Sequence, residues 1–156
     1  MTKVFPKKGH DHGLCSGRAL ERAAGVCREK GLRLTDLRRR VLEIVWTGHR
    51  PFGAYEILEI LRRARPGAQP PTVYRALDFL MDNGFVHRIE SLNAFVGCSV
   101  PERGHRGQFL ICRTCGRAAE IPDNGIEAAI SKSAAEVGFK VLRPTVEVEG
   151  LCPRCR

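Results

Sequence analysis

Two pairs of cysteines near the C-terminal end of the sequence have the spacing of a zinc-binding site. Two residues separate the cysteines of each pair, and the four positions are Cys112, Cys115, Cys152 and Cys155. A Cys-x-x-Cys turn holds two thiolates about one tetrahedral edge apart, and two such turns make a four-thiolate site with no open coordination position. The alternative is that each pair acts as a redox dithiol, but redox chemistry gives no reason for two Cys-x-x-Cys pairs to occur together. The spacing therefore predicts structural zinc.

A second group of candidate metal ligands is spread over the middle of the sequence. It consists of two imidazoles, a thiol and a carboxylate: His87, Cys98, His105 and Glu120. If they converged, they would form a set of two nitrogens, one sulfur and one oxygen, which suits zinc. A site that joins two parts of the chain fixes their relative angle, so the metal would act as a switch. The alternative is that the histidine and glutamate side chains are simply solvated and that Cys98 is an inert buried thiol.

The charge of the chain points to a polyanionic partner. The 156 residues include 26 Lys and Arg and 17 Asp and Glu, which gives a formal net charge of +9. Residues 1–100 hold 17 basic and 10 acidic side chains, whereas residues 101–156 hold 9 and 7. A basic excess of this kind favours nucleic acid. We therefore expect the first half to bind nucleic acid.

The first half is predicted to contain four helices followed by a hairpin. Apolar periodicity and stop residues place the helices at residues 14–30, 36–46, 54–63 and 72–82. Thr35 is suited to cap the second helix, Pro70-Pro71 suits only the start of the fourth, and Asn83-Gly84 ends it. Short apolar runs at residues 85–89 and 94–98 predict the hairpin. This order of elements is that of a winged helix-turn-helix.

The fourth predicted helix has an apolar face and a polar face. Its polar side presents Thr72, Tyr74 and Arg75, together with two aspartates. Arginine can bind guanine or a phosphate with two hydrogen bonds, and the tyrosine ring can contact a thymine methyl group. The same pattern fits an ordinary amphipathic helix, but the basic first half and the hairpin favour a DNA-reading helix. Residues 38–40, three arginines, are a second candidate for phosphate contact.

The second half is predicted to be a small α/β unit. Residues 108–112 and 117–121 read as strands, residues 123–138 as a helix, and residues 139–148 as an extended segment. Such a unit needs a staple or a partner to be stable. The predicted fold class is α+β, with a winged-helix domain at residues 1–99 (including a tail at 1–13), a hinge linker at 100–107 and a zinc-stapled domain at 108–156.

Several classes of protein are not expected. No apolar run is long enough to cross a membrane, and the first residues lack the apolar segment of a secretion signal, so the cytoplasm is the expected location. The sequence has no nucleophile elbow, phosphate loop or acid pair, and a four-cysteine zinc site leaves no position for a reactive water. We expect neither an enzyme nor a small organic substrate. A zinc-stabilised module that contacts nucleic acid without regulation is a further alternative.

The reading helix also carries a family resemblance. Residues 70–80, Pro-Pro-Thr-Val-Tyr-Arg-Ala-Leu-Asp-Phe-Leu, and residues 84–87, Gly-Phe-Val-His, resemble the recognition helix and wing entry of the zinc-responsive branch of the ferric uptake regulator (Fur) family. Residues 33–35, Arg-Leu-Thr, resemble the family's motif before its second helix. Together with both Cys-x-x-Cys pairs, the resemblance covers residues 20–156.

This resemblance implies a homodimer with N-terminal winged helices and a C-terminal dimerisation domain. It implies two Zn²⁺ ions per protomer, one structural and one regulatory. The structural ligands match Cys112, Cys115, Cys152 and Cys155, and the regulatory ligands match His87, Cys98, His105 and Glu120. Tyr74 and Arg75 match the family's base- and phosphate-contacting pair, and we add Thr72 and Thr35 as DNA-binding candidates. The implied function is a zinc-sensing repressor that binds palindromic operator DNA and controls zinc-uptake genes.

An iron-, manganese- or peroxide-responsive regulator of the same family is the alternative function. Members of those branches carry a His-rich run before the first cysteine pair, whereas residues 104–108 here contain one histidine. His10, His12 and Cys15 form an N-terminal cluster that fits a further metal site, although a tail with chance histidines explains it better. Cys27 is expected in the core, and His49 has no predicted role.

Overall fold

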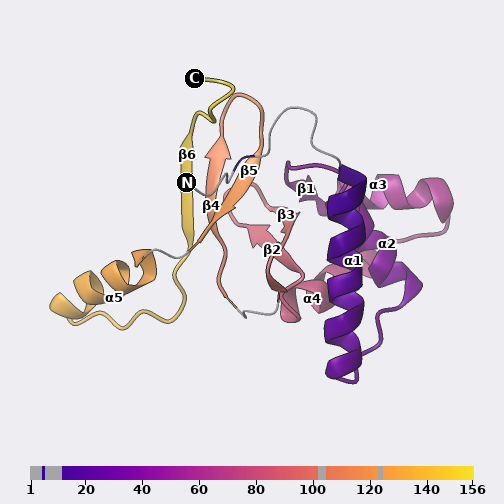
Figure 1. Cartoon of the computed structure of the whole chain (residues 1–156), viewed down its shortest axis with the longest axis horizontal. Coiled ribbons are helices and arrows are strands. Elements are labelled where there is room, and N and C mark those ends of the chain that lie inside the picture. Colours follow the sequence, from indigo (N-terminus) through magenta and orange to yellow (C-terminus); the bar gives the residue numbers. More distant parts are fainter. Residues whose placement is uncertain (1–4, 6–11, 102–104, 123–124) are drawn as a thin grey trace.

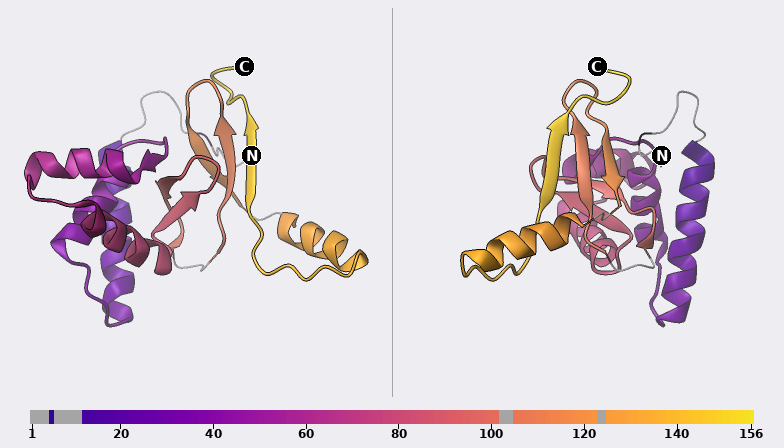
Figure 2. Two further views of the ribbon diagram at one scale, coloured as in Figure 1. Left: turned by 180° about the vertical axis from the view of Figure 1, so that it is seen from behind. Right: turned by 60° about the vertical axis from the view of Figure 1, so that its left-hand side comes forward.

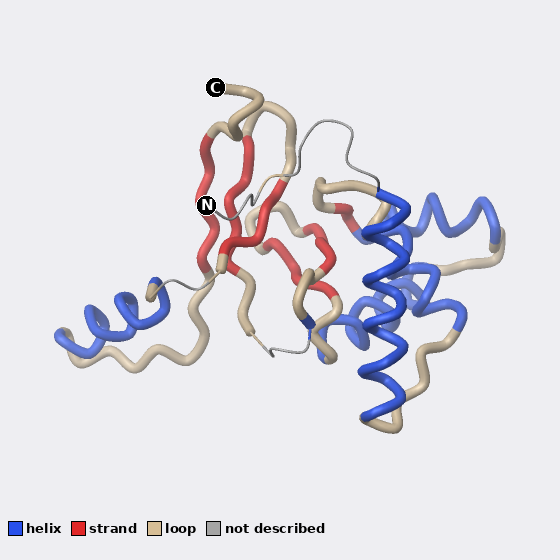
Figure 3. The backbone as a smooth tube through the Cα atoms, in the orientation of Figure 1, coloured by secondary structure: helices blue, strands red, loops and turns tan. Residues whose placement is uncertain are grey.

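The computed structural model describes residue 5 and residues 12–101, 105–122 and 125–156 (Figure 1). Its helices are α1 (His12–Glu29), α2 (Asp36–Val45), α3 (Ala54–Ala64), α4 (Pro70–Asp82) and α5 (Ile126–Glu136). Its strands are β1 (Phe52–Gly53), β2 (Val86–Ile89), β3 (Ala94–Gly97), β4 (Gln108–Cys112), β5 (Ala118–Ile121) and β6 (Val146–Gly150). The strands form two three-stranded sheets, in the orders β1-β3-β2 and β5-β4-β6. Both sheets lie between helices α1–α4 on one side and α5 on the other (Figure 3).

Local sequence signals account for the helices of the first half. The Thr35 side chain accepts a hydrogen bond from the backbone N–H of Arg38 at 3.4 Å, as expected of the cap of α2. Pro70 stands in the first turn of α4, where its missing N–H costs nothing, and Gly84 adopts the left-handed conformation (φ +72°) after the last turn. The predicted order of four helices and a hairpin is confirmed.

The core of the first half forms where α2, α3 and α4 pack on one another. Its fully buried side chains include Val41, Leu42, Ile44, Val45, Ile57, Leu58, Leu61, Val73, Leu77 and Leu80. Cys27 of α1 is buried in the same core, as predicted, and burial raises the pKa of its thiol. This core holds α4 against α2 and leaves the other face of α4 in solvent.

One strand of the first sheet is missing from the sequence prediction. β1 is two residues long and pairs with β3 through Phe52 and Phe95, so the hairpin becomes a three-stranded sheet. Two residues are too few to show an alternation of apolar and polar side chains, which is the sequence signal for a strand.

The second half contains the predicted strands, but its last segment differs from the prediction. β4 pairs antiparallel with β5 and parallel with β6. Of the segment 139–148 that was expected to be extended, only residues from Val146 onward join the sheet. The preceding residues run back beside α5 toward β6 without joining the sheet (Figures 1 and 2), and Pro144 has no N–H to donate. The predicted start of the helix at Asp123 lies outside the described residues.

The apolar side of α5 packs against no core. None of its residues is buried, and the helix projects away from the β5-β4-β6 sheet (Figure 2). Exposed apolar side chains on the helix and the segments that follow it are Ile130, Val137, Phe139, Leu142, Val148 and Leu151. Exposed apolar side chains in such number are often found at interaction sites of folded proteins.

The wing, defined as β2, β3 and their connecting turn, packs against the second sheet. Ile89 and Val96 of the wing form a buried cluster with Phe109 and Ile111 of β4, and Ala118 of β5 packs on it. The backbone N–H of Ala118 donates to the carbonyl oxygen of His49 at 3.1 Å. The two halves are therefore in direct contact. Among the described residues, no helix combines the length and apolar composition that crossing a membrane requires.

Candidate metal centres and nucleic-acid interface

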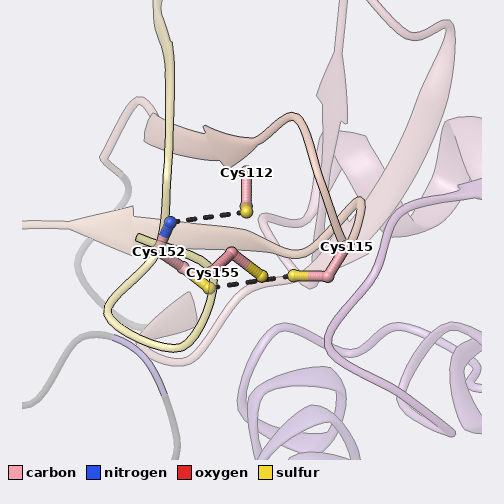
Figure 4. Close-up of side chains that lie close together, drawn as sticks. All are labelled: Cys112, Cys115, Cys152 and Cys155. Atoms are coloured by element: carbon pink, nitrogen blue, oxygen red, sulfur yellow. Dashed lines mark hydrogen bonds between the residues drawn. The ribbon is translucent and has the colours of Figure 1, made fainter.

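The four paired cysteines come together because β4 and β6 are parallel neighbours. Cys112 ends β4 opposite Gly150 of β6, so the turns that follow both strands lie at the same end of the sheet. All four sulfur atoms, of Cys112, Cys115, Cys152 and Cys155, lie within 4.8 Å of one another (Figure 4). The Sγ atoms of Cys115 and Cys152 are 3.8 Å apart. Two thiolates on one tetrahedral zinc ion at about 2.3 Å would be about 3.8 Å apart, so the set fits the metal.

Hydrogen bonds to Sγ of Cys112 favour its thiolate form. The backbone N–H of Cys152 donates to Sγ of Cys112 at 3.4 Å (Figure 4). This bond, with a second from the backbone of Cys115, lowers the pKa of Cys112 to about 6. Hydrogen bonding with Cys152, followed by burial and the nearby sulfur of Cys112, raises the pKa of Cys155 to about 12. Four thiolates this close therefore need a cation, and a closed four-thiolate set is the structural type of zinc site.

The second group of ligands converges where the two halves meet. His87 lies on β2, Cys98 directly follows β3, His105 precedes β4, and Glu120 lies on β5. Their donor atoms also lie within 4.8 Å of one another. Nε2 of His105 is hydrogen-bonded to Oε1 of Glu120 and lies 3.8 Å from Sγ of Cys98. The structure therefore brings together all four side chains that the sequence nominated.

The carboxylate of Glu120 is at the centre of this cluster. Burial raises its pKa, but the neighbouring imidazoles of His87 and His105 outweigh burial and hold the pKa below its usual value. Nε2 of His87 lies 3.2 Å from Oε1 of Glu120, without the geometry of a hydrogen bond. Within the described residues, Nε2 of His87 and Oε2 of Glu120 are buried without a hydrogen-bond partner. A cation between these atoms would satisfy both, so the cluster fits a metal.

Gly107, in the segment predicted to be a linker, leaves room for the rings of this cluster. The ring of His87 packs edge-on against Phe109, with centroids 5.6 Å apart. A Cβ atom on Gly107 would lie 2.3 Å from the Phe109 ring and 3.1 Å from Cγ of His87. No side chain fits between Gly107 and these rings without moving them. The sequence contains no signal for this requirement, because the close approach arises only when the linker folds over β4.

The outer face of α4 is open to a ligand. Tyr74 is 42% exposed and Arg75 is exposed, whereas Val73 and Ala76 beside them are buried. Thr72 is half-buried near the start of the same helix. A second exposed aromatic side chain, Tyr55 in the first turn of α3, was not singled out in the sequence and is 66% exposed. Its only sequence signal is its position between the buried residues of an amphipathic helix.

The three adjacent arginines of α2 have partners within the protein. The guanidinium of Arg38 lies 3.6 Å from the centroid of the Phe79 ring and donates to the carbonyl oxygen of Arg33. Arg39 and Arg40 both form ion pairs with Glu43, at 3.6 and 2.9 Å. Arg38 therefore links α2 to α4.

The remaining candidates are less well placed. His10 lies outside the described residues, and so does the side chain of His12. Cys15 is half-buried in α1, and no metal-ligand group among the described residues contains it. His49 is half-buried at the junction of the two halves, where its carbonyl oxygen accepts the hydrogen bond from Ala118.

Comparison with known proteins gives a consistent result. The model of the ferric uptake regulator family matches residues 29–149. The chain is 39% identical to the zinc uptake regulation protein of Escherichia coli K12 over 137 residues, which are 87% of this chain and 80% of that protein. It is 32% identical to the protein of the same name from Mycobacterium tuberculosis, over 81% of this chain and 96% of that one.

Solved structures agree with these relatives. A zinc uptake regulator complexed with zinc and DNA matches 89% of this chain and 93% of its own, with a TM-score of 0.83 and 38% identity. The crystal structure of holo XcZur matches 92% of this chain and 97% of its own, with a TM-score of 0.76 and 42% identity. The matched family model, the identities and the shared fold lead to one conclusion: the chain belongs to the ferric uptake regulator family.

Proposed function

We propose that the protein is a zinc-sensing transcriptional repressor, which binds palindromic operator DNA when its regulatory site is filled and thereby controls zinc-uptake genes. The observation that carries this proposal is the cluster of His87, Cys98, His105 and Glu120, which takes ligands from the wing and from the second sheet. Similarity to proteins named zinc uptake regulation protein, and to a zinc uptake regulator complexed with zinc and DNA, supports it.

Two zinc ions per protomer are part of the proposal. The structural ion would be held by Cys112, Cys115, Cys152 and Cys155, where it links the turns after β4 and β6 and stabilises a small unit. The regulatory ion would be held by the second cluster, where it supplies an attachment between the two halves. A donor set with a thiolate and two imidazoles favours zinc over ferrous iron or manganese, which prefer harder ligands.

The outer face of α4 is the proposed DNA-reading surface. Arg75 and Tyr74 are exposed there, and we assign base and phosphate contacts to them, with Thr72 and Thr35 as further contacts near helix N-termini. The excess of basic residues in the first half would strengthen attraction to phosphates. We retain residues 1–99 as the DNA-binding domain, 100–107 as the hinge and 108–156 as the dimerisation domain.

A homodimer would bury the exposed apolar side chains of α5 and the segments that follow it. Val137 and Leu142, which are 79% and 77% exposed, are suited to such an interface. Two-fold symmetry would place two α4 helices in successive major grooves, so the operator should be a pseudo-palindrome. Family members are transcription regulators, and we assign this chain no enzymatic activity and a cytoplasmic location.

Zinc-buffered selection of DNA tests this function. The purified dimer is mixed with sheared genomic DNA from its source organism, with zinc buffered at trace levels, with zinc removed, or with ferrous iron or manganese instead. We expect palindromic fragments to be captured only with zinc. Capture that requires iron or manganese would show a different regulator of the same family, and no enrichment under any condition would contradict operator binding.

A further inference from the structure

The turn of the wing is held by a carboxylate from the other half of the chain. Oε1 of Glu147 accepts the backbone N–H of Glu90 at 2.6 Å, and Oε2 accepts that of Ser91 at 3.0 Å. Glu147 lies on β6 and is half-buried. One carboxylate thus binds two consecutive amides of the turn, which is a strong, charge-assisted and geometrically restrictive contact.

The surroundings of Glu147 favour its ionised form. Burial raises the pKa of Glu147, but hydrogen bonds from Ser91 and from the backbone of Glu90 outweigh burial and hold the pKa below its usual value. Arg143 pairs with the Glu90 side chain at 3.0 Å, but both groups are exposed, so this ion pair contributes little. The hydrogen bonds that the Glu147 carboxylate accepts from the Glu90 and Ser91 amides are therefore the main polar attachment of the turn.

The wing is attached to the second sheet at both of its ends. At the open end, where Val86 pairs with Gly97, the neighbouring residues His87 and Cys98 belong to the regulatory cluster. At the turn, the attachment is Glu147. His87 and Glu90 are three residues apart along the wing, about 10 Å in an extended strand, and the apolar cluster of Ile89 and Val96 lies between these two ends.

The wing is joined directly to α4, which the core of the first half holds against α2. The backbone N–H of Phe85, the residue before β2, donates to the carbonyl oxygen of Leu80 in α4 at 2.8 Å. Only three residues separate the end of α4 from β2, and Phe85 and Val86 are buried in the same core as α4, so the helix and the wing belong to one packed unit. An attachment at the turn alone leaves the wing able to pivot, whereas attachment at both ends fixes its angle.

We infer that Glu147 is a positioning residue for zinc-controlled DNA binding: it fixes the turn of the wing, so that occupation of the regulatory site at the open end sets the orientation of α4. This inference rests on the proposed function and adds to it a residue that binds neither zinc nor DNA. Without the hydrogen bonds to Glu147, zinc would still bind, but zinc binding would raise the affinity for DNA by a smaller factor.

The variant Glu147→Gln tests the inference, with Glu149→Gln as the matched control. Glu149 is the next carboxylate on β6, is exposed and lies 3.7 Å from Arg113. Each protein is titrated with buffered zinc while binding to a captured operator is followed. Amide hydrogen exchange of Glu90 and Ser91 is measured in the zinc-loaded protein. For Glu147→Gln we expect half-maximal DNA binding to need about tenfold more free zinc and both amides to exchange about tenfold faster.

A second variant approaches the contact from the wing. Ser91 is the second residue of a turn in which the N–H of Asn93 donates to the carbonyl of Glu90. Proline is favoured at this place, so Ser91→Pro removes one amide donor and retains the turn. It should raise the zinc midpoint in the same direction, and it carries the test if Glu147→Gln does not fold.

The outcomes separate the inference from the function on which it rests. Folded variants that bind two zinc ions and have the zinc midpoint of the wild type would overturn the role of Glu147, even if amide exchange were faster. A wild-type protein whose DNA affinity does not depend on zinc would contradict the proposed function instead. In that case the protection of the Glu90 and Ser91 amides from hydrogen exchange would still show whether they are hydrogen-bonded to Glu147.

Discussion

Nε2 of His87 lies 3.2 Å from Oε1 of Glu120, so a strand of the wing and a strand of the second sheet meet at one carboxylate. These residues are far apart in the sequence and lie in separate sheets. A ligand that binds both therefore acts on the angle between the DNA-reading half and the rest of the protein. This relationship makes the cluster suited to regulation, whereas the four-cysteine set lies within one sheet and is suited to stability.

Loss of one structural thiol should unfold the second half. We expect Cys152→Ala to lose the structural zinc and the ordered structure of residues 108–156, because metal binding to a small site supplies about 10–16 kcal/mol of folding free energy in isolated zinc-finger peptides. Zinc content by mass spectrometry and circular dichroism would measure both effects. The control is Cys15→Ser, which changes a half-buried cysteine outside the set. A Cys152→Ala protein with wild-type structure and one zinc ion fewer would show that the site contributes no stability.

Replacement of Arg75 should weaken DNA binding without affecting the fold. The side chain is exposed on α4, so Arg75→Ala should leave thermal stability and zinc content unchanged. Loss of a base-contacting arginine costs about 1–3 kcal/mol, or about 5- to 150-fold in affinity. Fluorescence anisotropy with a captured operator measures the change. Lys132→Ala removes an exposed charge on α5 and controls for net charge, and equal affinities of the two variants would argue against a reading role for α4.

Addition of one methyl group at Gly107 should disturb the regulatory cluster. A Cβ atom there would meet the Phe109 ring at 2.3 Å, so Gly107→Ala must displace this ring and with it His87. Overpacking costs about 1–3 kcal/mol, and we expect the regulatory zinc to bind about tenfold more weakly while the structural zinc stays bound. Zinc competition with a fluorescent chelator measures both affinities. Gly67→Ala, at a glycine without a positive φ and with no atom within 4 Å of the added methyl group, tests whether any glycine replacement has the same effect.

The apolar side of α5 should be needed for the dimer. Val137 is 79% exposed in the single chain, so Val137→Asp should leave the fold of one protomer intact. A charge in an apolar interface is strongly unfavourable, and we expect monomers at concentrations at which the wild type is dimeric. Light scattering gives the mass, and Ala128→Asp, on the opposite side of the same helix, is the control. Dimers of unchanged stability in Val137→Asp would place the interface elsewhere.

Local sequence patterns predicted most of the secondary structure. Capping by Thr35, prolines at the start of α4 and glycine after its end act within a few residues of the chain, so they are visible in the sequence. The two ligand sets were also visible, because cysteine, histidine and glutamate in these combinations are chemically distinctive. That they converge follows from strand pairing, and the parallel alignment of β4 with β6 explains the meeting of the cysteines.

Features that depend on contacts between distant segments were not predicted. β1 exists because Phe52 meets Phe95, and its two residues have no periodicity of their own. The residues before Val146 have alternating or apolar character but find no strand partner, so they remain irregular. The bond from Glu147 to the wing is hidden for the same reason, since an acidic residue on a strand usually indicates a solvated face.

Occupation of the regulatory site should raise DNA affinity. The direct measurement is a buffered zinc titration in which native mass spectrometry counts bound zinc and anisotropy follows operator binding in the same samples. We expect affinity to rise about 5- to 150-fold as the count goes from one to two ions per protomer. Glu120→Ala should stay at one ion and low affinity, whereas Glu149→Ala should behave as the wild type does. Equal DNA affinity at one and two ions per protomer, or a full zinc response in Glu120→Ala, would show that the regulatory site does not control DNA binding.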